Sequence, residues 1–456
     1  MDSGAFLSKR GEQYALPANK NKLLEILRDV WHPINNPQGY MNLGVAENTL
    51  MHKELLQYVN TKLTVDGAAL GYGDSFSGSH RLKNVLATFL TRHFRAARPI
   101  QAADLVVTSG VSAAIEACAF TLGNVGDGVL LARPFYKAFP YNLSNRAGLR
   151  PVFVSFSGED PFGPESAAKY EHALLEAREQ GITVRALLLC NPHNPLGWSY
   201  PLGPVESVAT DPPEGTCASR QTLISYMELC QKYNLHVISD EIYGLSCWEN
   251  PETPEAPAFH STLSINPDGI IDPALVHVLW GISKDLGMNG VRMGCVVSQT
   301  NQSLIRALQT NSIFTYPSSL ADKITTMMLS DSSFIDNFVA ENRARLRTRY
   351  GEATAVLTRN GISYRPSNAA FFLWADLFSF WSPRLSPPNF ASIGVDAMTL
   401  EERLNEHLLS QKVFVTSGGS SGNEAAGWFR ITFALDGDYL REGLERLILA
   451  LKSFDV

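Results

Sequence analysis

The chain has 456 residues, which is too long for one simple core, so we expect one large domain and a smaller one. Hydrophobic residues make up 45% of it and charged residues 18%, and the net charge of −7 without a basic run argues against nucleic acid as a partner. The six cysteines are scattered without a CxxC pair, so neither a disulfide framework nor a metal site is expected.

The first residues lack the apolar stretch of a secretory signal, and no later run is long enough to span a bilayer. We therefore expect a cytoplasmic protein without membrane contact. Short apolar runs then alternate with helical patterns, one of which begins at Val111. The runs are Leu105–Val107, Gly128–Leu131, Ala186–Leu189, His236–Ile238, Val276–Leu279 and Cys295–Val297. This alternation predicts an α/β fold with a mostly parallel central sheet flanked by helices, in which ligands bind beyond the carboxyl ends of the strands.

A turn rich in glycine and serine follows the first of these strands, at residues 107–114. The backbone N–H groups of Val111, Ser112 and Ala113 suit a phosphate, with help from the Ser112 hydroxyl and the helix dipole. Taken alone, the turn predicts no more than an ordinary helix cap. Tyr136 follows the next strand, where it could stack on a planar ligand or serve as a core aromatic residue.

Two Asn-Pro steps stiffen the turn after the third strand, Asn191-Pro-His-Asn-Pro-Leu-Gly197. Asn194 would present its amide to a cofactor oxygen or a substrate carboxylate, and a purely structural turn is the alternative. The next strand ends in Val237-Ile-Ser-Asp-Glu-Ile-Tyr243. Asp240 could pair with a protonated pyridine nitrogen and Tyr243 with a phenolic oxygen, although Asp-Glu after a strand more often has a structural role.

The strongest motif runs from Gly281 to Gly294, GISKDLGMNGVRMG. An amine at Lys284, directly after a hydrophobic strand, can form a Schiff base with an aldehyde cofactor and later move a proton. We place Ser283 at the same cofactor, and Arg292, eight residues after the lysine, could neutralise a phosphate. The alternative is a surface lysine and arginine around a turn, which the glycine-flanked string argues against.

The C-terminal part contains Gly427-Trp-Phe-Arg430 at the start of an apolar strand. An arginine in apolar surroundings needs an anionic partner, either a substrate α-carboxylate held by its fork or an internal salt bridge. This part otherwise predicts a smaller α+β domain. We divide the chain into an N-terminal segment that packs on the small domain (1–54), a large cofactor-binding domain (55–325) and the small domain (326–456).

Together and in this order, the motifs resemble the fold-type I pyridoxal-phosphate enzymes of the class I/II aminotransferase family. Within the family they are most similar to 1-aminocyclopropane-1-carboxylate synthases and their fungal synthase-like relatives. The resemblance begins at about Tyr40 and includes Gly44-Val-Ala-Glu-Asn-Thr-Leu50. It implies pyridoxal 5′-phosphate as the cofactor and a homodimer with its active sites at the subunit boundary.

The resemblance also implies a role for each matching residue. Lys284 is then the imine lysine, Asp240 binds the pyridine nitrogen, and Tyr243 and Asn194 bind the phenolic oxygen. Arg430 binds the substrate carboxylate, with Asn194 and Glu47 also placed at the substrate.

The sequence departs from the family pattern in three places. Gly281 stands where the family has a phosphate-binding serine, and Phe76 stands where it has a tyrosine that crosses the dimer, unless Tyr72 fills that position. Residues 198–219 form an apparent insertion rich in proline, glycine and serine, of a length that indicates either a functional or a disordered loop.

We therefore expect an aminotransferase that acts on an α-amino acid through an external aldimine and a quinonoid, with Lys284, Asp240 and Tyr243 as catalytic residues. The reaction belongs to amino acid metabolism, and the relatives suggest secondary metabolism. A C–S lyase or a ring-closing, synthase-like enzyme is the alternative, because the same carbanion can eliminate or cyclise. An alternative of another class is a regulator that binds the cofactor without turnover.

Overall fold

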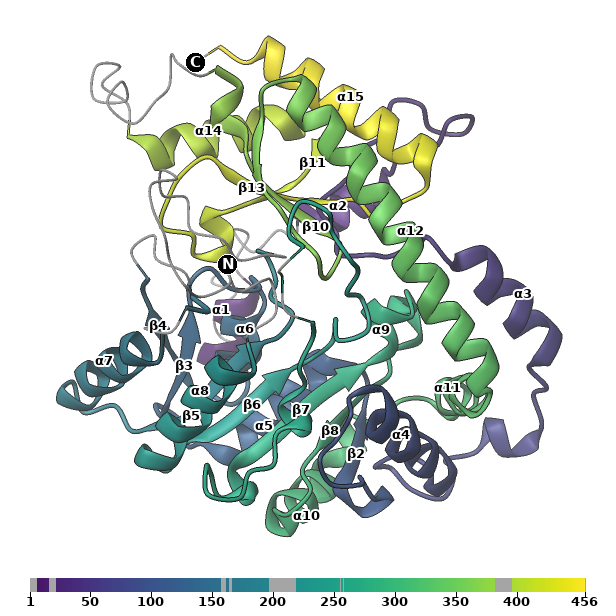
Figure 1. Ribbon diagram of the computed structural model, residues 1–456, viewed down its shortest axis with the longest axis vertical. Coiled ribbons are helices and arrows are strands. Elements are labelled where there is room, and N and C mark those ends of the chain that lie inside the picture. Colours follow the sequence, from purple (N-terminus) through teal and green to yellow (C-terminus); the bar gives the residue numbers. More distant parts are fainter. Residues whose placement is uncertain are drawn as a thin grey trace.

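A seven-stranded sheet forms the centre of the larger part of the molecule (Figure 1). The computed structural model describes residues 6–15, 22–156, 161–163, 166–196, 219–254, 256, 258–381 and 396–455. The sheet contains β2 (Leu105–Thr108), β3 (Gly128–Ala132), β4 (Arg150–Val154), β5 (Val184–Cys190), β6 (His236–Asp240), β7 (Val276–Gly281) and β8 (Gly294–Val297). Its order is β2-β8-β7-β6-β5-β3-β4, and β8 is antiparallel to both neighbours whereas the other pairings are parallel. The predicted mostly parallel α/β fold is confirmed.

One strand of this sheet, β4, was not predicted from the apolar runs in the sequence. It lies at the edge of the sheet and pairs with β3 alone among the described strands. Arg150 and Phe153 are exposed, so the strand lacks the continuous apolar run by which a doubly covered strand is recognised.

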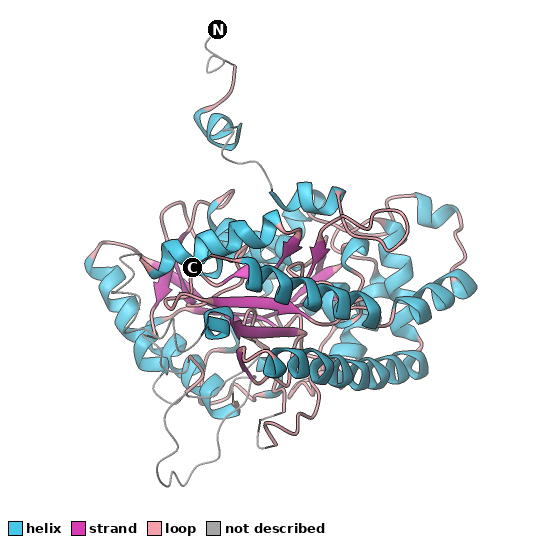
Figure 2. Cartoon of the chain, turned by 90° about the horizontal axis from the view of Figure 1, so that it is seen from above, coloured by secondary structure: helices cyan, strands magenta, loops and turns pink. Residues whose placement is uncertain are grey.

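Alternate residues of the central strands face opposite sides of the sheet, and each side is covered by helices (Figure 2). The covering helices are α5 (Val111–Leu122), α6 (Phe139–Ser144), α7 (Ser166–Glu179), α8 (Arg220–Tyr233) and α10 (Gln302–Asn311). Leu187 and Val237 pack in one apolar cluster with α7 and α8, whereas Leu188 and Ile238 pack in the other with α5 and α10. Burial of each such side chain contributes about 1.5–3 kcal/mol.

A second, four-stranded antiparallel sheet lies in the C-terminal part of the chain, in the order β12-β13-β10-β9. Its strands are β9 (Ser363–Arg365), β10 (Phe372–Asp376), β12 (Thr416–Ser417) and β13 (Trp428–Thr432). A short pair, β1 (Met41–Asn42) with β11 (Val413–Phe414), joins the N-terminal segment to this part. The domain limits at residues 54/55 and 325/326 stay predictions.

The remaining described helices connect and cover these sheets. They are α1 (Lys9–Ala15), α2 (Lys22–Arg28), α3 (His52–Lys62), α4 (His80–His93), α9 (Ile282–Asp285), α11 (Ser319–Ser330), α12 (Ser332–Arg359), α14 (Ala397–Ser410) and α15 (Gly437–Ser453). Helix α12 has 28 residues and runs past both sheets (Figure 1). Within the described ranges, no helix has the length and apolar character needed to cross a bilayer.

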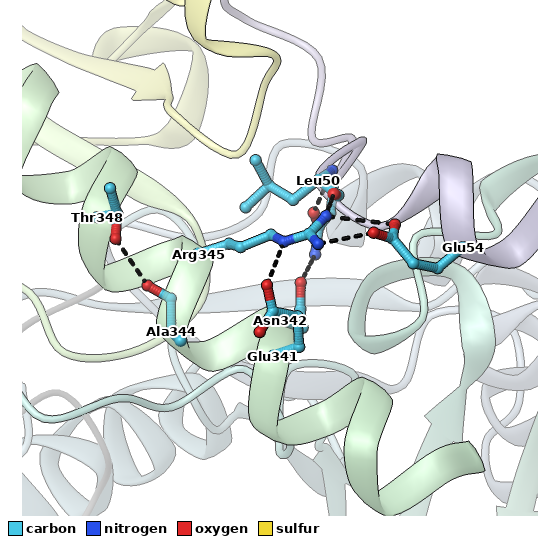
Figure 3. Close-up of polar contacts among 8 residues, drawn as sticks. Leu50, Glu54, Glu341, Asn342, Ala344, Arg345 and Thr348 are labelled. Carbon is cyan, nitrogen blue, oxygen red and sulfur yellow. Dashed lines mark hydrogen bonds and ion pairs between the residues drawn. The ribbon is translucent and has the colours of Figure 1, made fainter.

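Arg345 of α12 fixes the N-terminal segment to the rest of the molecule (Figure 3). Its guanidinium donates to the Leu50 carbonyl oxygen at 2.6 Å, to Glu54 Oε1 at 2.7 Å and to Glu341 Oε1 at 2.7 Å. One turn away, Asn48 Nδ2 donates to Asn342 Oδ1 at 2.9 Å. These contacts fix the backbone that follows Ala46.

Candidate active site

The predicted site residues gather where five parallel strands end. Strands β2, β3, β5, β6 and β7 share one direction, so their carboxyl ends lie at the same edge of the sheet. A cavity of about 170 Å³ opens there. Nine predicted residues line it: Val111, Ser112, Tyr136, Asn194, Asp240, Tyr243, Ser283, Lys284 and Arg292.

Five further residues line the cavity without having been predicted: Ile115, Phe139, Cys190, Ile242 and Asn289. Two of them could have been predicted from the sequence. Cys190 is the last residue of β5, where ligands bind, and Asn289 lies within the glycine-flanked lysine motif. Ala113 is not among the lining residues, and its N–H donates to the Gly110 carbonyl oxygen at 3.1 Å.

Lys284 lies in the single turn of α9, directly after β7. Its Nζ donates to the Ala46 carbonyl oxygen at 2.6 Å. Burial, together with the positive charges of Arg430 and Arg292, lowers the pKa of Lys284 to about 8, and the nearby Glu47 carboxylate acts in the opposite direction. At a pKa of about 8, roughly a tenth of this amine is neutral at pH 7, far more than for an ordinary lysine, and the neutral form is the one that acts as a nucleophile or base.

Asp240 ends β6 as a buried carboxyl group with one local hydrogen bond, from the Ile242 N–H at 3.2 Å. Burial raises its pKa to about 7, with a smaller contribution from Glu241. It forms no ion pair with any residue in the described part of the chain. A buried carboxylate is stable only beside a positive or hydrogen-bonding partner, so this position fits a protonated ring nitrogen.

A chain of hydrogen bonds leads from the cavity to Arg430. Asn194 Nδ2 donates to the Tyr243 hydroxyl at 3.2 Å, and Arg430 Nη1 donates to Asn194 Oδ1 at 2.8 Å. Arg430 Nη2 also donates to the Gly44 carbonyl oxygen at 2.6 Å. The hydrogen bonds join the segments that follow β5 and β6 to β13, so they connect the two sheets.

Arg430 is a buried cation with unused binding capacity. It is 4% exposed, its guanidinium lies 4.4 Å from the centre of the Phe372 ring, and burial lowers its pKa. Its Nε has no hydrogen-bond partner, and no carboxylate of the described residues pairs with it. The internal salt bridge that was the alternative for this arginine is therefore not formed among these residues, and an anion would satisfy it.

Arg292 and the first turn of α5 together fit a phosphate. Arg292 has a left-handed backbone (φ 60°), and its Nη2 donates to the Ser109 carbonyl oxygen at 3.3 Å. The helix begins after Gly110 without a side-chain cap, which leaves the Val111 and Ser112 N–H groups for an anion. A Cβ atom on Gly110 would lie 2.5 Å from Arg292 Nη2.

Gly281 has a steric reason to differ from the serine of the family pattern. A Cβ atom there would lie 2.6 Å from the Met293 carbonyl oxygen and 3.0 Å from the Gly294 Cα. Any side chain at this position would therefore push β7 and β8 apart. The groups that remain available for a phosphate are Arg292 and the N–H groups at the start of α5.

Phe76 and Tyr72 lie on the surface and do not line the cavity. Their ring centres are 5.9 Å apart, and the Phe76 ring lies 5.1 Å from that of Tyr316. Tyr72 is 75% exposed and Phe76 38%. Which of them fills the position of the dimer-crossing tyrosine stays a prediction. The apparent insertion at 198–219 lies outside the described residues except for Ser219, which caps α8.

Replacing Gly110 by alanine should weaken cofactor binding. Gly110 has φ 94° and ψ 164°, a conformation that costs other residues about 1–3 kcal/mol, and the added methyl group would displace the Arg292 guanidinium. Gly126→Ala is the matched control, because Gly126 has φ 92° and open space around it. The thermal unfolding temperature should fall for both variants. The affinity for pyridoxal phosphate, measured by fluorescence titration, should fall only for Gly110→Ala. Equal titrations would contradict the phosphate assignment.

Comparison with known proteins identifies the family of the chain. The model of the family "Aminotransferase class I and II" matches residues 38–211 and 210–447. A probable aminotransferase of Aspergillus oryzae is 31% identical over 98% of both chains. The 1-aminocyclopropane-1-carboxylate synthase-like protein 1 of Takifugu rubripes is 30% identical over 93% of this chain and 64% of its own length.

Solved structures of aminotransferases share the fold of this chain. The N-succinyldiaminopimelate aminotransferase from Mycobacterium tuberculosis superposes with a TM-score of 0.70 at 22% identity, over 97% of this chain and 100% of that one. The identity is low, so this match speaks for the fold alone. Family model, relatives and fold agree, and the chain belongs to the class I and II aminotransferase family of pyridoxal-phosphate-dependent, fold-type I enzymes.

Proposed function

We propose that this enzyme is an aminotransferase that takes the amino group from an α-amino acid. The observation that carries the proposal is the buried Arg430, a cation without a carboxylate partner among the described residues, linked through Asn194 to a cavity that contains Lys284. Such an arginine suits the one group that every α-amino acid shares, its carboxylate. The family assignment itself extends to a pyridoxal-phosphate-dependent enzyme of the aminotransferase fold.

The described residues fit the cofactor group by group. Arg292 with the Val111 and Ser112 N–H groups would hold the phosphate, and Asp240 would hold the ring nitrogen. Tyr243 and Asn194 would hold the phenolic oxygen, Tyr136 would lie on the ring face, Ser283 would line the same site, and Lys284 Nζ would be the point of attachment. Bound pyridoxal phosphate supplies an aldehyde for the amino group and a ring that withdraws electrons from the Cα–H bond.

The protein's own part is to bind, orient and move a proton. The Arg430 fork and the Asn194 amide would fix the α-carboxylate, which sets the direction of the Cα–H bond. Lys284 Nζ, whose lowered pKa of about 8 keeps it partly neutral, would accept the Cα proton and deliver it to another carbon. A leaving group on the substrate side chain would turn the same proton removal into elimination or ring closure.

A homodimer belongs to the proposal. Tyr72, Phe76 and Tyr316 form an aromatic cluster on the surface, next to a hollow of about 850 Å³ that Tyr72 and Tyr316 line. Exposed aromatic clusters of this kind favour a protein interface. The family resemblance implies that a second copy of the chain covers this surface. Analytical ultracentrifugation of the purified enzyme measures whether it is a dimer.

The reaction is tested by a screen of amino acids and S-substituted cysteines. Keto acid, ammonia and the aminated cofactor are measured separately. Keto acid formed with an equal amount of aminated cofactor and no ammonia supports the aminotransferase. Ammonia and keto acid that are both released over many turnovers indicate the lyase, and a cyclic product indicates the synthase-like reaction. If the cofactor absorbance does not respond to any amino acid, the protein is the non-catalytic regulator.

Replacing Arg430 by lysine should weaken the binding of α-amino acids by roughly 1.5–3 kcal/mol, the scale of a hydrogen bond to a charged group. Lysine keeps the charge but loses the planar fork, so the substitution tests geometry. Cofactor loading should stay unchanged, because the phosphate is assigned to Arg292. The measurement is an absorbance titration with an amino acid and with its decarboxylated amine. Equal weakening for both ligands would show that Arg430 supports the fold instead.

A further inference from the structure

A second cavity of about 770 Å³ lies between α12, the end of α4 and the loop that follows β6. Three arginines line it, Arg95, Arg343 and Arg347, and we call it the arginine cavity. Glu249 is the one acidic residue among its described lining residues, and it is exposed. The cavity therefore carries a concentrated positive charge.

The arginines of the cavity differ from their neighbours on α12. Arg345 pairs with Glu54 and Glu341, and Arg349 pairs with Glu352. By contrast, Arg95, Arg343 and Arg347 form no ion pair within the part of the chain that the structure describes. Arg343 and Arg347 are one helical turn apart, so their charges repel one another when no anion is bound.

Buried polar groups without partners occur in the same place. Trp248 Nε1, Thr253 Oγ1 and Asn368 Oδ1 are buried and make no hydrogen bond, and all three residues line the arginine cavity. Trp248 as a whole is 6% exposed. These atoms are closed off from solvent, and the Asn368 oxygen is an acceptor that an anion cannot satisfy, so they form a polar wall behind the cavity and the unpaired arginines carry the case for an anion.

The walls of the arginine cavity are hydrogen-bonded to residues that flank the active site. Arg343 Nε donates to the Leu245 carbonyl oxygen at 2.8 Å, and the Leu245 N–H donates to Asp285 Oδ2 at 3.0 Å. Asp285 directly follows Lys284. On another wall, the His260 carbonyl oxygen accepts from Asn191 Nδ2 at 2.9 Å.

We propose that the arginine cavity binds a small organic polyanion, with two or more carboxylate or phosphate groups, and that this binding changes the affinity of the active site for its amino acid. Guanidinium groups bind both kinds of oxyanion through paired hydrogen bonds. Phe94, Phe259 and Trp248 offer apolar surface for the rest of the molecule. The volume lies within the range of about 300–1,000 Å³ that is usual for small-molecule sites. Binding itself does not depend on which reaction the enzyme catalyses.

The binding test is calorimetry on the cofactor-loaded enzyme with pyrophosphate and with citrate. The double variant Arg95→Gln/Arg347→Gln removes two exposed side chains that make no hydrogen bond in the described residues, so the fold is expected to persist. It should bind the anion at least about tenfold more weakly, the effect of about 1.4 kcal/mol. The control, Arg306→Gln/Arg441→Gln, removes the same charge from α10 and α15 and should bind like the parent.

Each outcome decides the site. Weakening for pyrophosphate alone assigns a phosphorylated ligand, weakening for citrate alone assigns a carboxylate ligand, and weakening for both supports their shared chemistry. No binding by the parent at millimolar anion, or equal binding by parent and double variant, would overturn the site.

The coupling is measured by titrating an amino acid into the loaded enzyme with and without saturating anion, following cofactor absorbance. Coupled sites should shift the apparent affinity at least about fivefold in the parent and not in the double variant. An equal shift in both proteins would show competition at Arg430, and no shift would show a site without coupling. Either result overturns the coupling.

Discussion

Replacing Lys284 by alanine is expected to abolish covalent attachment of the cofactor and turnover of amino acids. No second lysine is among the described residues that line the cavity. Loss of a positioned proton-transfer group alone slows a reaction by about 10²–10⁴-fold, and loss of the attachment point comes in addition. Arg292 and the first turn of α5 remain, so the cofactor should still bind noncovalently. The measurement is the absorbance of the loaded variant together with amino acid turnover.

Lys137→Ala is the matched control for this prediction. Lys137 is another partly buried lysine whose pKa burial lowers, with Arg430 adding to the effect, but it is not among the lining residues. It should keep attachment and turnover. Borohydride reduction of the parent followed by peptide mass analysis locates the modified lysine directly. Cofactor mass on a peptide without Lys284 would refute the assignment.

Replacing Asp240 by asparagine should keep the cofactor bound but slow removal of the Cα proton by about 10²–10³-fold. An amide has nearly the shape of the carboxyl group, so packing is preserved, but it cannot stabilise a positive ring nitrogen. The loss corresponds to about 2.7–4 kcal/mol, the scale of one removed electrostatic contact at a transition state. The measurement is exchange of the Cα proton in deuterated water, which reports this step whatever reaction follows.

The neighbouring Glu241 supplies the control, because burial raises its pKa to about 7 as well. Its carboxyl group accepts from Ser239 Oγ at 2.9 Å and from the Thr262 N–H at 2.8 Å, and it does not line the cavity. Glu241→Gln should therefore lower stability with little change in the exchange rate of the folded enzyme. If Asp240→Asn kept exchange within a few-fold of the parent, the role of Asp240 at the ring nitrogen would be wrong.

The sequence was informative wherever a buried strand ended in a polar residue. Asp240 and Lys284 follow apolar runs, and because parallel strands end at one edge of a sheet, their convergence was predictable. Strand β4 was not predictable in this way, because its exposed edge position replaces the apolar run by a mixed one. Local patterns therefore predicted the doubly covered strands and missed the edge strand.

Contacts between distant segments could not be read from local patterns. The bond from Lys284 Nζ to the Ala46 carbonyl oxygen joins residues 238 positions apart through a backbone atom, which leaves no mark on residue type. The unpaired state of Arg430 is similar, since motif and spacing leave a salt bridge and a ligand equally open. The steric reason for Gly281 also became visible only when β7 and β8 were placed side by side.

The Ala46 carbonyl oxygen accepts two hydrogen bonds, one from Lys284 Nζ at 2.6 Å and one from Asn289 Nδ2 at 3.1 Å. If Lys284 were the only donor to this oxygen, its departure would leave a buried acceptor without a partner, which costs about 1–3 kcal/mol. Asn289 removes that penalty, because the oxygen stays satisfied after the amine has left. Lys284 is thus held by a contact that it can give up at low cost, and the role proposed for it, anchoring a ligand and then carrying a proton, requires this freedom.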